Sequence, residues 1–199
     1  QGGGFFRSSA KRKRPNLQLY MQAITTVVHK PMERPLLTPD TFSGFSLGLS
    51  SCRPTSRGTI EIRSANPFEQ PKITANAYST ATDVQEMLEG TRIIRRIAAQ
   101  EPLASLIAEE MMPGPSCVSD KDVINDFRQR SSTIYHPVST CRMGPSPSAS
   151  VVDSTLRVHG VQNLRVCDAS IFPNLISGNT NAASMMVGWK GAEIILGAR

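Results

Sequence analysis

The hydrophobic pattern of the N-terminal part of the chain is typical of β-strands. Residues 17–28 (LQLYMQAITTVV) are rich in β-branched and aromatic side chains and predict one strand. Apolar and polar positions alternate twice between residues 43 and 64, around residues 45–49 and again in GTIEIRS at 58–64. This alternation predicts a half-buried antiparallel arrangement, with one face of each strand turned toward a core.

Two segments with helical periodicity follow these strands. In the first, Asp83 is the predicted N-cap, and Glu86 three residues later completes a capping box. The second is predicted to begin at Ser119, with Asp122 in the same relation to it. Apolar residues recur at helical spacing in both segments: Val84, Met87, Leu88, Ile94 and Ile97 in the first, and Val123, Ile124 and Phe127 in the second.

The C-terminal part of the chain has a different pattern. Residues 131–150 mix Ser, Thr, Pro and Gly with one His and one Arg, which is typical of a functional loop on a scaffold. Short apolar runs at 156–158 and 163–170 then precede a final apolar helix. Three of its large side chains are expected in the core: Met185, Met186 and Trp189. A strand, a loop and a helix in this order indicate the end of an α/β layer. Because the strands before it are antiparallel, the predicted fold class of the whole chain is α+β.

The composition is that of a folded and moderately basic protein. The 199 residues include 22 Lys and Arg against 16 Asp and Glu, a formal net charge of +6, and 39% are hydrophobic. These values exclude a disordered tail, and no apolar run of about 18 residues predicts an integral membrane segment. The sequence begins without Met, and its first basic residues follow the apolar pair, the reverse of a signal peptide. We expect a piece of a longer, cytoplasmic protein.

Cysteine spacing and basic charge indicate neither a metal site nor a nucleic-acid partner. The cysteines are Cys52, Cys117, Cys141 and Cys167. No pair has the CxxC spacing of a zinc site, and a chain of this size can bury a core without disulfides, so reduced thiols are expected. The basic cluster at residues 11–14 has no interleaved aromatic residues and ends in Pro15, which favours a solvated loop over nucleic-acid binding.

Among the three histidines, His136 is the best candidate for a general base. His29 and His159 are predicted at a strand end and in a turn. His136 stands between Tyr135 and Pro137, and a proline biases the preceding residue toward extended backbone, so the imidazole has a defined direction. A neutral imidazole can accept a proton near pH 7. Taken alone, this position still favours a structural histidine.

Four blocks of sequence in a particular order favour a catalytic role for His136 over a structural one. They are RPNLQLY from residue 14, GTIEIRSANPFEQPKI from 58, YHPVSTCRMG from 135, and DAS at 168–170 followed by SGNTNAASMMVGWKGAEII. The last blocks resemble the HPxGTCRMG, VxDAS and GNTNAPTxMIAEKAADxI patterns of glucose-methanol-choline (GMC) flavin oxidoreductases, of the choline dehydrogenase-like and alcohol dehydrogenase-like kind. Ser139 replaces the usual Gly and Ala183 the usual Pro, changes that a backbone of standard geometry is expected to accept.

The resemblance implies catalytic roles for two residues. His136 would accept the hydroxyl proton of an alcohol while hydride passes to the flavin of FAD. Asn179 matches a position that carries His or Asn in the family, and would hydrogen-bond the substrate oxygen beside that base. A donor and an acceptor on one oxygen suit a substrate that becomes more anionic as it loses its proton. The alternative is that Asn179 only caps the last helix.

The resemblance also implies four cofactor-binding residues. Asp168 and Ala169 are predicted to end a strand, at the edge where an open α/β sheet binds its ligand. Thr180 and Asn181 would open the last helix, whose N-terminal amides suit the electron-rich end of a flavin. A simple turn and helix cap at these positions remains the alternative.

The expected domain organisation follows from the same resemblance. Residues 1–150 would form part of a substrate-binding domain, and residues 151–199 the terminal strand and helix of an FAD-binding domain. No GxGxxG motif occurs, so the nucleotide site is expected in an N-terminal FAD-binding half of the same protein. The predicted partners are that half and a small-molecule alcohol. The competing functions are a hydroxynitrile lyase on the same fold and a non-enzymatic fragment or binding module.

Overall fold

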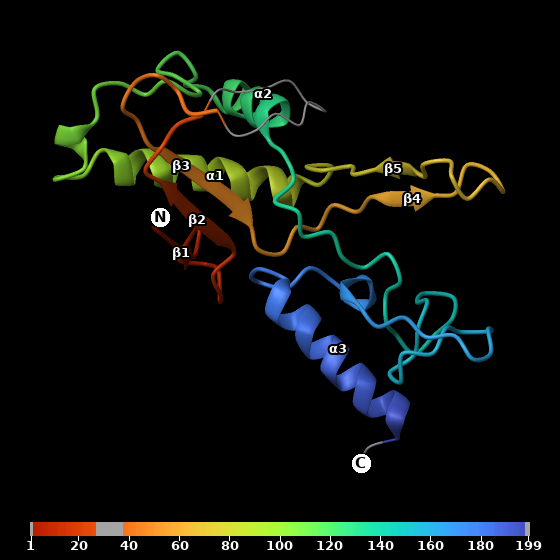
Figure 1. The fold of residues 1–199 in the computed structure, drawn as a ribbon. Helices are drawn as coiled ribbons and strands as arrows, with labels where there is room; N and C mark the ends of the chain where they lie inside the picture. Colours follow the sequence, from red (N-terminus) through yellow and green to blue (C-terminus); the bar gives the residue numbers. More distant parts are fainter. Residues whose placement is uncertain (1, 27–37, 198–199) are drawn as a thin grey trace. The chain divides into compact units, whose positions relative to one another are not determined.

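The described residues divide into two units, each with its own internal packing. The computed structural model describes residues 2–26 and 38–197 (Figure 1). The first unit combines the described residues up to Thr55 with Tyr78–Ser132, and the second combines Ser56–Ala77 with the described residues from Thr133 onward. The second unit contains the candidate base.

The predicted boundary at residue 150 does not coincide with a boundary between the two units. Residues 56–77 and 133–150 both belong to the same unit as the C-terminal segment. The assignment of 1–150 to a substrate-binding domain and of 151–199 to an FAD-binding domain therefore stays a prediction about function.

Three antiparallel strands form the sheet of the first unit. They are β1 (Gly2–Phe6), β2 (Leu17–Gln22) and β3 (Ser46–Ser51), paired in that order. The antiparallel pairing is as predicted. The strand predicted over 17–28 is too long, because β2 ends at Gln22, directly opposite Ser46, where its partner begins. Residues 27–37 lie outside the described part of the chain.

Helix α1 (Ala81–Ala98) packs closely on this sheet, against β3 (Figure 1). A Cβ atom on Gly90 would lie 2.6 Å from Leu49 Cδ1 and 2.9 Å from Leu17 Cδ1, so helix and sheet meet at a residue without a side chain. Leu17 is fully buried and shares the core of the first unit with Met87.

The start of α1 corrects the predicted capping box. The N-cap is Thr80, whose hydroxyl accepts a hydrogen bond from the backbone N–H of Asp83. Asp83 lies inside the helix, and its buried carboxylate accepts hydrogen bonds from the N–H and hydroxyl of Thr55. Glu86 forms an ion pair with Arg12 instead of a cap, so one member of the basic cluster has a structural role.

Helix α2 (Asp120–Arg130) begins where the sequence predicts. Ser119 and Asp122 form a reciprocal capping box, which confirms that prediction. Its buried Phe127 packs against Tyr78 with ring centroids 4.8 Å apart.

The segment between α1 and α2, which includes the short 3-10 helix η1 (Ala104–Leu106), is held by one arginine. Arg95 donates hydrogen bonds to both carboxylate oxygens of Glu110 and to the carbonyl of Cys117. The four cysteines are free thiols, and burial raises the pKa of Cys52 and Cys117.

The second unit contains a two-stranded ribbon, β4 (Thr59–Glu61) and β5 (Lys72–Thr74), which pair antiparallel. The expected half-burial is wrong here, because every residue of both strands is exposed, and Ile62 just beyond β4 is 89% exposed. Among the described residues only β4 and β5 pair in this sheet, so their alternating apolar residues face no second layer there.

The strand expected from the apolar runs at 156–158 and 163–170 does not form in the described chain. This stretch pairs only through isolated bridges. Three of its residues have left-handed backbone: Leu156 with φ 68°, Gly160 with φ 75° and Asn163 with φ 58°. Such residues interrupt extended backbone, so alternation of apolar residues is not enough to build a strand.

Asp168 and Ala169 accordingly do not end a strand. Asp168 caps a turn of 3-10 helix, η2 (Ala169–Ile171), by accepting a hydrogen bond from Ser170 N at 2.7 Å. The predicted terminal strand of an α/β layer is therefore replaced by a capped turn that packs against the last helix.

That last helix, α3 (Asn181–Leu196), is confirmed, but it buries a different face from the one expected. Val187 and Gly191, one turn apart, are buried. Three side chains predicted in the core are exposed by more than half: Met185 at 62%, Met186 at 59% and Trp189 at 74%. They lie on the side of the helix away from the Val187 face, and Trp189 Nε1 donates to Glu193.

The described residues show neither a membrane span nor a metal cluster. None of the helices in this part of the chain is long and apolar enough to cross a bilayer. Within the same residues, no group of three or more His, Cys, Asp or Glu side chains is placed to hold a metal ion.

Gly191→Ala is expected to destabilise the protein by about 1–3 kcal/mol, the usual effect of overpacking. The new Cβ would lie 1.9 Å from Cys167 Sγ, which is held by a hydrogen bond to Val187 O. Gly188→Ala is the matched control, because its added Cβ meets no atom within 4 Å beyond its chain neighbours and the local helix backbone, and alanine favours the helix by up to about 1 kcal/mol. Urea unfolding of both variants checks this, and equal stability would contradict the tight packing.

Candidate active site

The loop that carries His136 is fixed to η2 by backbone hydrogen bonds. The N–H groups of Cys141 and Met143 donate to the carbonyl oxygens of Ser170 and Ile171, at 3.0 and 2.8 Å. The two sequence blocks YHPVSTCRMG and DAS are therefore joined in space.

The backbone on both sides of His136 is in the left-handed region. Tyr135 has φ 62° and Ser139 has φ 72°. The expectation that Ser139 replaces Gly at standard backbone geometry is wrong, because its φ is left-handed. This conformation costs a residue with a Cβ about 1–2 kcal/mol. The strained loop persists because Val138, within it, packs into the apolar core of the second unit.

His136 contacts two consecutive residues at the start of α3. Its Nε2 lies 2.7 Å from Asn179 Nδ2, and its Nδ1 lies 3.1 Å from Thr180 Oγ1. Asn179 is exposed, His136 is half-buried and Thr180 is 8% exposed. The structure thus brings together the predicted base His136, its predicted amide partner Asn179, and Thr180, which the sequence assigns to the cofactor.

This arrangement has one accessible edge, where Nε2 and the Asn179 amide meet. The opposite edge of the ring, at Nδ1, faces the buried Thr180 hydroxyl. A small hydroxyl compound that inserts at the accessible edge would find a proton acceptor and an N–H donor side by side.

The other predicted site residues lie around this group in the second unit. Asn181 is the first residue of α3 and is exposed, and Thr180 is the N-cap, so neither asparagine caps the helix. Asp168 is exposed and Ala169 is half-buried at the start of η2, which packs against α3. The contact of Thr180 with His136 was not predicted from the sequence. The available signal is Ala183, which stands where a capping box would have an acidic side chain.

His159 has other partners than the group around His136. His159 Nε2 lies 3.2 Å from Ser150 Oγ and 3.1 Å from the carbonyl oxygen of Gly144, which fits the predicted turn. His29 lies outside the described residues.

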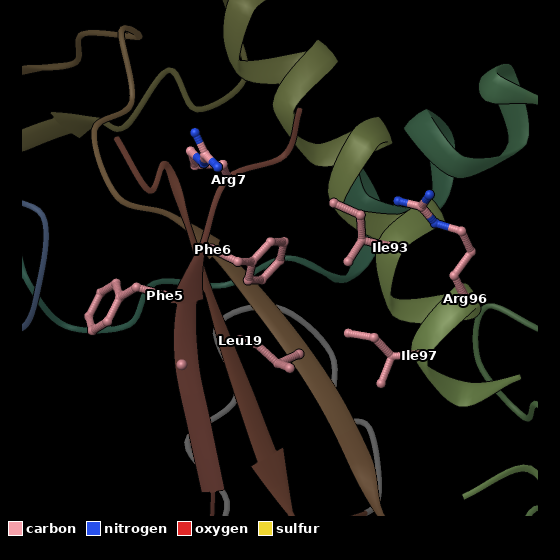
Figure 2. A pocket seen from close by; sticks show the side chains of 8 residues that line it. Phe5, Phe6, Arg7, Leu19, Ile93, Arg96 and Ile97 are labelled. Atoms are coloured by element: carbon pink, nitrogen blue, oxygen red, sulfur yellow. The ribbon is translucent and has the colours of Figure 1, made fainter. Parts of the chain in front are cut away.

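A hollow of about 440 Å³ in the first unit has a different character (Figure 2). Apolar side chains of β1, β2 and α1 line it, among them Phe6, Leu19 and Ile97, and Arg96 lies at its edge. It contains neither a histidine nor a carboxylate and is not a candidate catalytic centre.

Comparison with curated proteins shows extensive similarity. An alcohol dehydrogenase [acceptor] of Pseudomonas putida is 43% identical over 196 residues, 98% of this chain and 34% of that protein. The mitochondrial choline dehydrogenase of Homo sapiens is 38% identical over 196 residues, 98% of this chain and 32% of that protein. The chain therefore spans about a third of the length of these relatives.

Solved structures agree with this similarity. Pyridoxine 4-oxidase from Mesorbium loti matches 99% of this chain and 38% of its own, with a TM-score of 0.84 and 28% identity. A formate oxidase of Aspergillus oryzae, from a study of FAD modification, matches 93% of this chain and 32% of its own, with a TM-score of 0.80 and 26% identity. Residues 54–188 match the family model described as GMC oxidoreductase, and the chain belongs to the GMC oxidoreductase family.

Proposed function

We propose that this chain carries the catalytic base of an FAD-dependent oxidoreductase that acts on the CH–OH group of a small alcohol. The observation that carries the proposal is the 2.7 Å approach of Asn179 Nδ2 to His136 Nε2 at the accessible edge of the ring. Family membership and relatives named alcohol and choline dehydrogenase support this class of substrate.

In the proposed reaction, the substrate hydroxyl takes the place of the direct contact between Asn179 and His136. The substrate O–H donates to His136 Nε2, and the substrate oxygen accepts a hydrogen bond from Asn179 Nδ2. As the C–H bond breaks, the O–H proton moves to Nε2 and a carbonyl group forms. FAD, when bound, supplies the acceptor for the hydride. Asn179 then stabilises the oxygen while its negative charge increases.

The residues around the base fit one end of FAD. The first N–H groups of α3 receive no side-chain cap, so they are available to an electron-rich ligand. Thr180 and Asn181 would contribute at this helix start, and Asp168 with Ala169 at the neighbouring turn. The rest of the cofactor would bind the N-terminal FAD-binding half named above, because this sequence has no GxGxxG motif.

The competing functions have less support. The relatives and neighbours named above are dehydrogenases and oxidases, which does not favour a hydroxynitrile lyase or a binding module without activity. A cytoplasmic location stays a prediction from the sequence.

His136→Ala in the complete enzyme should slow flavin reduction by a factor of about 100 to 10,000, the usual contribution of a general base. Substrate affinity should change much less, because the proton moves only in the transition state. Rapid mixing with substrate under anaerobic conditions measures the rate.

His159→Ala is the control for this prediction. It removes a ring that contacts Ser150 and Gly144, so it should lower thermal stability and leave the reduction rate of the folded enzyme nearly unchanged. An unchanged rate in His136→Ala would exclude His136 as the base.

Asn179→Asp should reduce turnover more than Asn179→His, although Asp is closer in shape. An ionised carboxylate cannot donate, and its charge repels an oxygen that becomes more anionic toward the transition state. Histidine still donates. Turnover and thermal unfolding of both variants are the measurements, and full activity in the Asp variant would show that Asn179 does not bind the substrate oxygen.

A further inference from the structure

Helices α1, α2 and α3 begin in two different ways. The N-caps of α1 and α2, Thr80 and Ser119, have extended backbone, with ψ 147° and 155°, and their hydroxyl groups accept an N–H of the first turn. Thr180 is the N-cap of α3, but its φ of −80° and ψ of −11° are helical, and its side chain makes no capping bond. Because capping requires the extended backbone, the Thr180 hydroxyl is directed elsewhere.

That hydroxyl is directed at the candidate base. Thr180 Oγ1 lies 3.1 Å from His136 Nδ1, and the residue is 8% exposed, so water has little access to this contact. The third residue of α3 is Ala183, whereas α1 and α2 have Asp83 and Asp122 there, so no acidic side chain competes for the hydroxyl.

The hydrogen atoms of the neighbours define the roles of the two ring nitrogens. The Asn179 amide nitrogen can only donate, so His136 Nε2, 2.7 Å away, accepts and carries no proton. In a neutral imidazole the single proton is then on Nδ1, which donates to Thr180 Oγ1. This is the tautomer whose Nε2 lone pair is ready to accept a proton from a substrate.

We propose that Thr180 is a positioning residue that holds His136 in the Nδ1–H tautomer, with the Nε2 lone pair toward the accessible edge of the site. The inference deepens the proposed function and rests on it, because it takes Nε2 as the proton acceptor. It also changes the role expected for Thr180. With its hydroxyl engaged by the base, Thr180 would contact a flavin through its backbone N–H only.

Replacement of the hydroxyl tests the kinetic part of the proposal. Thr180→Val in the complete enzyme keeps the shape but removes the acceptor for Nδ1–H, so the rate of flavin reduction should fall about 10- to 100-fold, as for other groups that orient a histidine. KM should change little, because the substrate does not touch this hydroxyl. Thr180→Ser keeps an acceptor and should restore most of the rate.

Thr80→Val is the matched control for loss of an N-cap threonine. Its hydroxyl caps α1, so this variant should unfold at a lower temperature and keep its reduction rate when folded. Thr180→Val should show the reverse, a small change in unfolding temperature and a large loss of rate. If Thr180→Val loses stability and keeps its rate like the control, Thr180 is a structural residue and the proposal is wrong.

The tautomer itself can be read without turnover. In the full-length holoenzyme labelled with ¹⁵N-histidine, the His136 resonances are assigned by comparison with His136→Gln. The proposal requires a protonated Nδ1 and an unprotonated Nε2 in the neutral ring. It requires mixed tautomers in Thr180→Val, because without an acceptor for Nδ1–H the Asn179 amide can turn and its Oδ1 can accept from a protonated Nε2. A wild-type ring protonated on Nε2, or an unchanged tautomer in Thr180→Val, would overturn it.

The two proposals fail in different ways. An unaffected rate in His136→Ala would reject the base and, with it, the function. A large loss in His136→Ala together with a normal rate and tautomer in Thr180→Val would reject only the positioning role.

Discussion

The packing of the His136 loop against the start of α3 is the constraint on which the rest of the site depends. Only one half-buried ring and two consecutive residues meet there. Their separation is set by a core that joins Val138 from the loop, Ile171 from η2 and Val187 from α3. Because close-packed cores transmit small displacements, a change in this apolar cluster would move the ring relative to its partners without touching either. The geometry of the candidate site therefore depends on the hydrophobic packing.

The fold could be predicted from sequence where local chemistry decides the structure. Ser119 and Asp122 satisfy each other across one helical turn, so the start of α2 follows from those two residues alone. Predictions failed where a distant partner or the backbone conformation decides. The sequence predicts Asp83 as a cap because its partner Thr55, far away in the chain, is not visible as a pattern. Positive φ at Leu156 interrupts a stretch whose apolar residues look like a strand.

The sequence indicates candidate site residues, whereas their contacts come from the structure. The family-like blocks around His136 and Asn179 indicated both residues, and the structure places them 2.7 Å apart. The sequence assigns Thr180 to the cofactor because it stands at a helix start, and in the structure its side chain faces His136. A helix N-cap offers a side chain and a backbone N–H that can serve different partners, and a linear pattern does not separate them.

The contact between Cys167 and Gly191 also limits how this sequence can evolve. The two positions share one small volume, in which the sulfur of the first occupies the place of a side chain on the second. Substitutions there are therefore coupled: a residue with a side chain at 191 becomes acceptable only after position 167 has become smaller, and a larger residue at 167 requires glycine to remain. Among homologous sequences, the order of such replacements should be directional, with the change at 167 preceding the change at 191.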